Sequence, residues 1–99
     1  MGQTEQPYRK LISQGDSYVE AIILPEILGG RPCMYIHKVW VEETKRETGL
    51  GRKLLDDAVR FAVEVGCHKV FLVSKPATTG FYAKSGFSGD QIGMVLRLG

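Results

Sequence analysis

The fold is decided by the stretch Val41-Glu42-Glu43-Thr44-Lys45-Arg46-Glu47-Thr48-Gly49-Leu50-Gly51-Arg52-Lys53, where a strand-like run ends and a helix-like run begins. Gly49 and Gly51 carry no Cβ atom, so a ligand can approach the backbone N–H groups closely at this turn. The first turn of a helix leaves its N–H groups unpaired and carries the positive end of the helix dipole, which favours a phosphate by roughly 0.3 to 2 kcal/mol. Arg46 and Arg52 add two full positive charges. The stretch therefore predicts an anion-binding loop.

Two common phosphate-binding motifs do not fit this loop. A dinucleotide-binding fingerprint requires a third glycine where Leu54 stands, and a P-loop requires Lys and then Ser or Thr directly after Gly51, where Arg52 and Lys53 stand. What remains is Arg46-x-x-Gly49-x-Gly51 behind the hydrophobic run Val39-Trp40-Val41. This pattern resembles the acetyl-CoA pyrophosphate loop of the GNAT (GCN5-related) N-acetyltransferase family.

A second segment, Phe81-Tyr82-Ala83-Lys84-Ser85-Gly86-Phe87, is similar to the Phe-Tyr-x-x-x-Gly-Phe segment of the same family. On these two matches the chain is identified as a member of that family, in a short form. The resemblance implies acetyl-CoA as cosubstrate, with the pantetheine beside Val39, Trp40 and Val41. It places the pyrophosphate at Arg46, Glu47, Thr48, Gly49, Leu50, Gly51 and Arg52, with further contacts from Tyr82 and Lys84. It implies no metal.

The resemblance also implies a chemistry, in which an amine attacks the acetyl thioester directly. Tyr82 matches the family tyrosine that acts as general acid toward the departing thiolate, although it could instead be a packing aromatic beside Phe81. His37 is the candidate base because imidazole exchanges protons near neutral pH, the alternative being a hydrogen-bonded core histidine. His68 lies far from the loop along the chain and is a poorer choice. An asparagine often found upstream in the family is absent, and Ser74, Thr78 and Thr79 are the nearby polar substitutes.

Composition and length limit the class of protein. A chain of 99 residues forms one domain and can bury about two thirds of the surface that its unfolded chain exposes. With 43% hydrophobic residues, 24% charged residues and a net charge of +2, it has the composition of a soluble globular domain. No basic stripe with interleaved aromatics indicates nucleic acid, and no apolar run indicates a membrane span. Residues 1–6 lack the features of a signal peptide, so we expect a cytoplasmic protein with a flexible start and reduced cysteines.

The pattern of apolar residues predicts an α+β fold. Residues 8–13 and 17–24, around Gln14-Gly15-Asp16, predict a β-hairpin, and 25–32 predict a loop. Residues 33–41 predict a central strand covered on both sides, because both of its alternating faces are largely apolar. A helix over 51–65 ends at Gly66, and a strand over 69–73 should run parallel to 33–41. A short helix over 78–85, with Thr78 as N-cap, and a strand over 92–98 complete the chain.

The family resemblance adds the arrangement of these elements. It implies a mixed, mostly antiparallel sheet in which the parallel pair, 33–41 and 69–73, splays apart. We expect the Trp40 ring to pack in the core. Because Gln14 to Asp16 stand where the family has one or two helices, the acceptor side should be shallow and open. The expected activity is acetyl transfer to an amine, with a protein lysine or chain terminus as acceptor, by a monomer or homodimer. The alternatives are a CoA-binding regulatory module and an interaction protein that only shares the fold.

Overall fold

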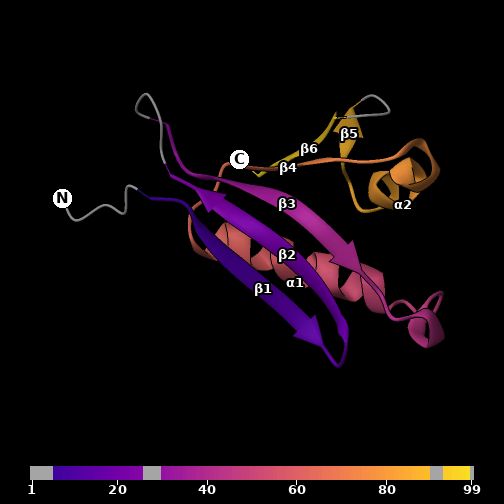
Figure 1. The fold of residues 1–99 in the computed structure, drawn as a ribbon. Helices are drawn as coiled ribbons and strands as arrows, with labels where there is room; N and C mark the ends of the chain where they lie inside the picture. The colour runs from indigo at the N-terminus through magenta and orange to yellow at the C-terminus, as the bar shows by residue number, and fades with distance from the viewer. Residues whose placement is uncertain (1–5, 26–29, 90–92, 99) are drawn as a thin grey trace.

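The computed structural model describes residues 6–25, 30–89 and 93–98. Six strands form one sheet in the order β1-β2-β3-β4-β6-β5, in which β3 and β4 are parallel and the other described pairs are antiparallel. The elements are β1 (Tyr8–Gln14), β2 (Ser17–Leu24), β3 (Cys33–Trp40), η1 (Glu43–Lys45), α1 (Leu50–Glu64), β4 (Lys69–Val73), η2 (Pro76–Thr78), α2 (Thr79–Lys84), β5 (Ser88–Gly89) and β6 (Gly93–Arg97). This confirms the α+β fold with a mixed sheet (Figure 1). The flexibility predicted for residues 1–6 stays a prediction, because residues 1–5 lie outside the described residues.

The predicted hairpin is confirmed as β1 and β2. Their register runs without a break from Tyr8 opposite Ile23 to Gln14 opposite Ser17. Gly15, in the turn, has a φ of 60°, a left-handed conformation that glycine adopts at little cost. Alternate residues of β2 are buried, from Ser17 to Ile23, so this face of the hairpin points to the core.

Helix α1 covers one face of the sheet. Its buried residues are Leu54, Leu55, Ala58 and Ala62, which follow the helical period that the sequence predicts. The helix spans 50–64 rather than 51–65, with Val65 as its C-cap, and the next residue, Gly66, has a φ of 87°. A left-handed glycine here ends the helix, as predicted. Figure 1 shows α1 behind β1, β2 and β3, with α2 to one side.

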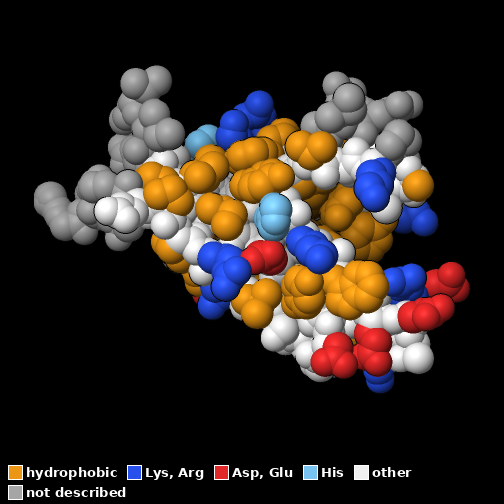
Figure 2. Space-filling model, in the orientation of Figure 1, with side chains coloured by type: hydrophobic (Ala, Val, Ile, Leu, Met, Phe, Trp, Pro, Cys, Tyr) orange, Lys and Arg blue, Asp and Glu red, His pale blue; other side chains and the backbone are white. Residues whose placement is uncertain are grey.

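The other face of the sheet is open over β3, contrary to prediction. Met34 and Ile36 are buried against α1, whereas Tyr35 is half-buried and His37 and Lys38 are exposed. Figure 2 shows hydrophobic side chains gathered on this open face. The prediction failed because the residues on this face are apolar, as they would be on a face covered by a helix. No described helix covers this face of β3 in the structure.

A β-bulge at His37 changes the direction of the side chains that follow. Glu20 on β2 lies opposite Lys38 while Ala21 lies opposite Ile36, so His37 has no partner on β2. The extra residue reverses the alternation of β3. Val39 therefore packs against the core, and Trp40 is left 42% exposed. The prediction that the Trp40 ring packs in the core is wrong for this reason.

Strands β3 and β4 separate after a short parallel contact. Their paired residues are Met34 with Val70, Tyr35 with Phe71, and Ile36 with Leu72. Beyond Ile36, β3 continues to Trp40 and pairs only with β2. Strand β4 ends at Val73, one residue after Leu72, and its other side pairs with β6. The predicted splayed pair is thus present, and it opens toward the loop that follows β3.

The C-terminal elements match the prediction in outline. The expected helix over 78–85 is a short 3₁₀ turn, η2, followed by α2. Thr78 occupies the N-cap position, but its hydroxyl donates to the Lys75 carbonyl oxygen at 3.0 Å and makes no cap hydrogen bond to α2. Strand β6 is confirmed, while the two-residue strand β5 was not predicted.

Gly51 lies where three elements meet. A Cβ atom added at Gly51 would lie 3.1 Å from Val41 Cγ2 and 3.5 Å from Phe81 Cζ. The end of β3, the first turn of α1 and helix α2 therefore pack together around a residue that has no side chain. The absence of a Cβ atom is what allows this close approach.

We predict that Gly51→Ala destabilises the protein by about 1–2 kcal/mol, because the overpacking at Val41 exceeds the gain in helix propensity. Urea unfolding monitored by circular dichroism measures this change. Gly80→Ala in α2 is the matched control, since a Cβ atom there meets no atom within 4 Å. The control should keep or slightly raise the free energy of unfolding. Equal stabilities for the two variants would contradict the predicted contact.

Candidate active site

The loop after β3 is fixed at its start by a buried serine. Ser17, the first residue of β2, is fully buried, and its Oγ accepts a hydrogen bond from the Glu42 N–H at 2.8 Å. The Lys45 N–H then donates to the Glu42 carbonyl oxygen at 2.8 Å, which closes the turn η1. The hairpin therefore holds the beginning of the loop in place. No pattern in the sequence predicts this role of Ser17.

Arg46 and Trp40, both predicted site residues, are brought together at the exposed side of the loop. The guanidinium carbon of Arg46 lies 5.1 Å from the centre of the Trp40 ring. Its Nε donates to the Val41 carbonyl oxygen at 3.0 Å. The two contacts hold the arginine charge against the loop backbone, where cation–π attraction favours it.

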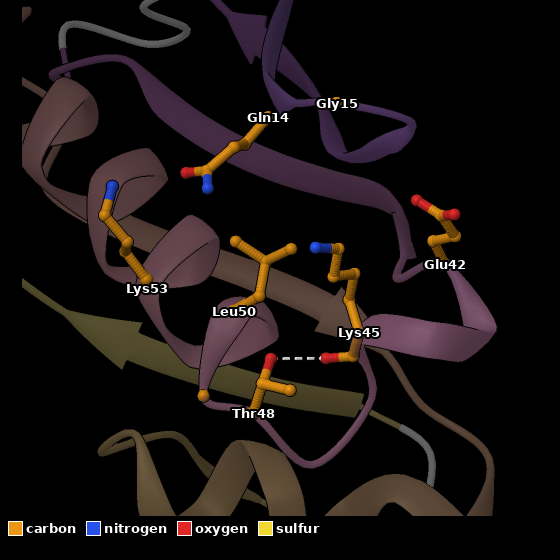
Figure 3. A pocket seen from close by; sticks show the side chains of 8 residues that line it. Gln14, Gly15, Glu42, Lys45, Thr48, Leu50 and Lys53 are labelled. Atoms are coloured by element: carbon orange, nitrogen blue, oxygen red, sulfur yellow. Dashed lines mark hydrogen bonds between the residues drawn. The ribbon is translucent and has the colours of Figure 1, made fainter.

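The backbone turns into α1 through two left-handed residues. Glu47 has a φ of 65° and Gly49 a φ of 92°. Thr48 stands between these two residues, and its hydroxyl donates a hydrogen bond to the Lys45 carbonyl oxygen (Figure 3). Gly49 is the N-cap and provides no side-chain cap. The bond from the Lys53 N–H to the Gly49 carbonyl oxygen, at 3.0 Å, begins the helical pattern. The N–H groups of residues 50–52 therefore have no acceptor within the helix.

Arg52 is placed differently from Arg46. Its Nε lies 3.5 Å from Asp56 Oδ1 on the solvent-exposed surface of α1. An exposed pair of this kind is weak and is readily exchanged for another anion. Arg52 thus remains in the first helical turn, as predicted, with its charge directed along the helix.

A cavity of about 500 Å³ lies between the β1–β2 turn and the start of α1. Figure 3 shows the side chains of Gln14, Lys45 and Leu50 pointing toward one another within it. The residues that line it are Gln14, Gly15, Glu42, Lys45, Thr48, Gly49, Leu50 and Lys53. The loop motif predicted Thr48, Gly49 and Leu50 among these residues, but not the others. Lys45 and Lys53 lie on either side of the Gly49-x-Gly51 motif in the sequence. Their positive charges could have marked them as candidate anion-binding residues.

Tyr82 packs beside two phenylalanines. Its ring centre lies 5.1 Å from that of Phe81 and 6.0 Å from that of Phe87, edge-on in both cases, and the residue contacts the core. Burial raises the pKa of the Tyr82 hydroxyl above its ordinary value, so this group keeps its proton at neutral pH. The packing role of Tyr82 is confirmed, and its role as acid stays a prediction. Lys84, the last residue of α2, is exposed.

His37 lies exposed on the open face, at the bulge and beside the splayed strands. Its ring centre is 6.1 Å from that of Tyr35. The alternative of a hydrogen-bonded core histidine is wrong, because His37 lies on the open face of the sheet, like Tyr35, and is exposed to solvent. His68 lies before β4, and its Nδ1 is 3.0 Å from the Arg31 carbonyl oxygen and 3.2 Å from that of Pro32. That histidine joins two chain segments at the other end of the strands.

Ser74 follows β4 directly and is one of the predicted polar substitutes. It is buried, and its Oγ lies 3.1 Å from Thr79 Oγ1 in the first turn of α2. The Thr79 hydroxyl in turn donates to the Lys75 carbonyl oxygen at 3.2 Å. The pair ties the carboxyl end of β4 to α2, which carries Tyr82.

The two cysteines are free thiols at the amino ends of β3 and β4, away from the loop. Burial, with a smaller contribution from Cys33, raises the pKa of the Cys67 thiol to about 11. Burial also raises the pKa of Cys33. Over the described ranges, no three His, Cys, Asp or Glu side chains gather as a metal site would require. Over the same ranges, α1 and α2 are too short or too polar to cross a membrane.

Comparison with known proteins agrees with the motifs. Residues 10–87 match the model of the acetyltransferase (GNAT) family. Over 90 residues the chain is 31% identical to a probable glucosamine 6-phosphate N-acetyltransferase 2 of Oryza sativa subsp. japonica, covering 91% of this chain and 52% of the relative. It is 37% identical over 70 residues to glucosamine 6-phosphate N-acetyltransferase of Trypanosoma brucei brucei, covering 71% of this chain and 48% of the relative. The chain thus spans about half the length of these curated relatives.

A solved structure extends the likeness to three dimensions. The NatC complex bound to Gag peptide and CoA matches with a TM-score of 0.75 at 20% identity, covering 84% of this chain and 61% of that chain. At this identity the match shows the fold alone. The fold, the two sequence motifs and the family match over residues 10–87 agree, and the chain belongs to the GNAT acetyltransferase family.

Proposed function

We propose that this chain is an acetyl-CoA-dependent N-acetyltransferase that moves the acetyl group to a primary amine. The observation that carries the proposal is the opening between β3 and β4, which faces the uncapped first turn of α1. On the side of β3 that faces β4, residues 37–40 pair with no strand among the described residues. Their backbone groups on that side are available to hydrogen-bond the amides of a pantetheine arm.

The loop supplies the binding site for the phosphates of the cosubstrate. The N–H groups of residues 50–52 carry the positive end of the α1 dipole. Arg46, held by Trp40 and the Val41 carbonyl oxygen, adds a full positive charge to the same loop. Lys45 and Lys53 add charge from the adjoining cavity. The pyrophosphate is an anion of acetyl-CoA, and this loop is the part of the site that would bind it.

We predict that Gly49→Asp raises the Kd for acetyl-CoA about a hundredfold or more, because it places a carboxylate against the phosphates. Isothermal titration calorimetry measures the change. Gly66→Asp is the matched control, because Gly66 also has a left-handed φ, 87° against 92° for Gly49, and open space at its Cβ position. It lies at the other end of α1, so its Kd should equal that of the wild type. Equal loss of affinity in both variants would point to backbone strain instead.

The chemical step joins the amine nitrogen to the acetyl carbon and breaks the carbon–sulfur bond. The departing thiolate takes a proton, which Tyr82 supplies in this proposal, and the attacking nitrogen loses a proton to His37 or to solvent. Support for Tyr82 comes from its place on α2 and from its raised pKa, which keeps the donor form at neutral pH. Support for His37 comes from its exposure beside the opening.

We predict that Tyr82→Phe lowers kcat by about 10²- to 10⁴-fold with little change in the Kd of acetyl-CoA. Since a general acid must be protonated and the pKa of Tyr82 is raised above 10.0, the wild type should show no loss of activity from Tyr82 below about pH 10. Rates of CoA release against pH test both points. Phe81→Leu controls for altered packing on α2. Unchanged turnover in Tyr82→Phe would leave Tyr82 with its packing role alone.

Two observations bear on the nature of the acceptor, and they favour different amines. The open sheet face can admit an amine that protrudes from a protein, such as a lysine side chain or chain terminus. The names of the two curated relatives favour an amino sugar phosphate. Lys38, exposed beside His37, offers a positive charge for such a phosphate. We propose glucosamine 6-phosphate as the acceptor, with a protein amine as the second candidate.

We predict a kcat/KM for glucosamine 6-phosphate at least about tenfold above that for glucosamine, since a charged hydrogen bond to the phosphate contributes roughly 1.5–3 kcal/mol. An assay of CoA release with glucosamine 6-phosphate, glucosamine and a lysine-containing peptide measures the ranking. A higher kcat/KM for the peptide would favour the protein amine. Binding of acetyl-CoA without transfer to any acceptor would favour the regulatory module.

A further inference from the structure

Strand β1 forms one edge of the sheet and presents an unpaired side. Its seven residues pair with β2, and the strand order places no described strand beyond it (Figure 1). The backbone N–H and C=O groups on the outer side of an edge strand are free to pair with another strand. An edge of this length therefore can accept a complete further strand.

The devices that usually protect an edge strand are missing from β1. Its sequence, YRKLISQ, holds no proline, and its register with β2 contains no bulge. Both of its cations are drawn away from the edge: Arg9 pairs with Glu20 at 2.8 Å, and the Lys10 Nζ lies 4.5 Å from the centre of the Phe61 ring on α1. Neither charge projects along the sheet, where it would repel an incoming strand.

A shallow groove adjoins the same edge on the side of α1. Its volume is about 300 Å³, and its lining combines an aromatic ring with charges of both signs: Lys10, Leu11, Ile12, Asp57, Arg60, Phe61 and Glu64. On the other side of the strand, the Leu11 side chain is 55% exposed. An added strand could place alternate side chains over Phe61 and over Leu11.

We propose that the occupant of this edge is β1 of a second copy of the chain, paired antiparallel about a two-fold axis at Leu11. Leu11 is the middle residue of β1, so this register pairs all seven residues. It sets Leu11 against its own copy and Arg9 and Lys10 against Ser13 and Ile12 of the partner copy. No like charges face each other. A register centred on Lys10 would instead set the two lysines opposite one another, which is unfavourable.

Charge on α1 is compatible with the same symmetry. A two-fold axis perpendicular to the sheet keeps both α1 helices on one face and runs them antiparallel. Along the groove the charges alternate in sign, with Asp57 and Glu64 on either side of Arg60. Within one copy Arg60 pairs with Asp57 at 2.9 Å, so Glu64 is the acid of the groove that can approach Arg60 of the other copy. The dimer would continue the sheet across both molecules and does not depend on the proposed acetyl transfer.

We predict that the wild type sediments as a dimer in analytical ultracentrifugation and that Leu11→Lys raises the dimer Kd at least about tenfold, because it sets like charges across the axis. Val63→Lys is the matched control, since Val63 is 57% exposed on α1 and does not line the groove. Both variants should keep the wild-type circular dichroism spectrum. A monomeric wild type at all concentrations, or equal Kd values for wild type and Leu11→Lys, would overturn the proposal.

A cross-link tests the register directly. Facing residues in an antiparallel pair have Cα atoms about 4.5–5.5 Å apart, within reach of a disulfide. With oxidised glutathione as oxidant, Leu11→Cys should form a covalent dimer on a non-reducing gel, whereas Val63→Cys should not. Equal cross-linking of both variants would indicate random collision and would overturn the register.

Discussion

The hydrogen bonding of β3 changes at His37, and the positions of the candidate site residues depend on this change. Up to Ile36 the strand is paired on both sides, and beyond the bulge it is paired with β2 alone. The same extra residue sends Val39 inward and Trp40 outward. The opening beside β4 begins at the same residue as the bulge, and the reversed alternation directs Val41 toward Gly51 and leaves the Trp40 ring free to hold Arg46.

The elements whose signal is local were predicted correctly. The helical spacing of Leu54, Leu55, Ala58 and Ala62 and the glycine that ends α1 belong to single segments, so the sequence contains all the information they need. The bulge is not a local feature of this kind, because it depends on how Glu20 and Ala21 of β2 pair with β3. Without it, strict alternation places Trp40 inside. The apolar face around Tyr35 and Phe71 is equally ambiguous, since its residues do not reveal whether anything covers them.

The residues of the candidate site also fall into two groups: those that a local motif predicts and those that only the folded chain brings together. The glycines and Arg46 of the loop were found from the motif, because a phosphate-binding turn requires these residue types at fixed spacing. Gln14, Gly15 and the supporting Ser17 were not found, since they reach the loop only after the hairpin has paired with β3. Lys45 and Lys53 fall between these cases. Their charges are visible in the sequence, but their convergence on one cavity is a property of the folded chain (Figure 3).

The burial of Cys67 has a consequence for the proposed thioester chemistry. Acyl exchange onto a cysteine requires the thiolate, and with a pKa of about 11 only about one Cys67 side chain in ten thousand is ionised at pH 7. Cys67 also lies at the end of β4 remote from the loop. At the proposed site, an activated acyl donor would therefore leave the Cys67 sulfur unmodified. Such chemical inertness follows from the packing that encloses the thiol in the core.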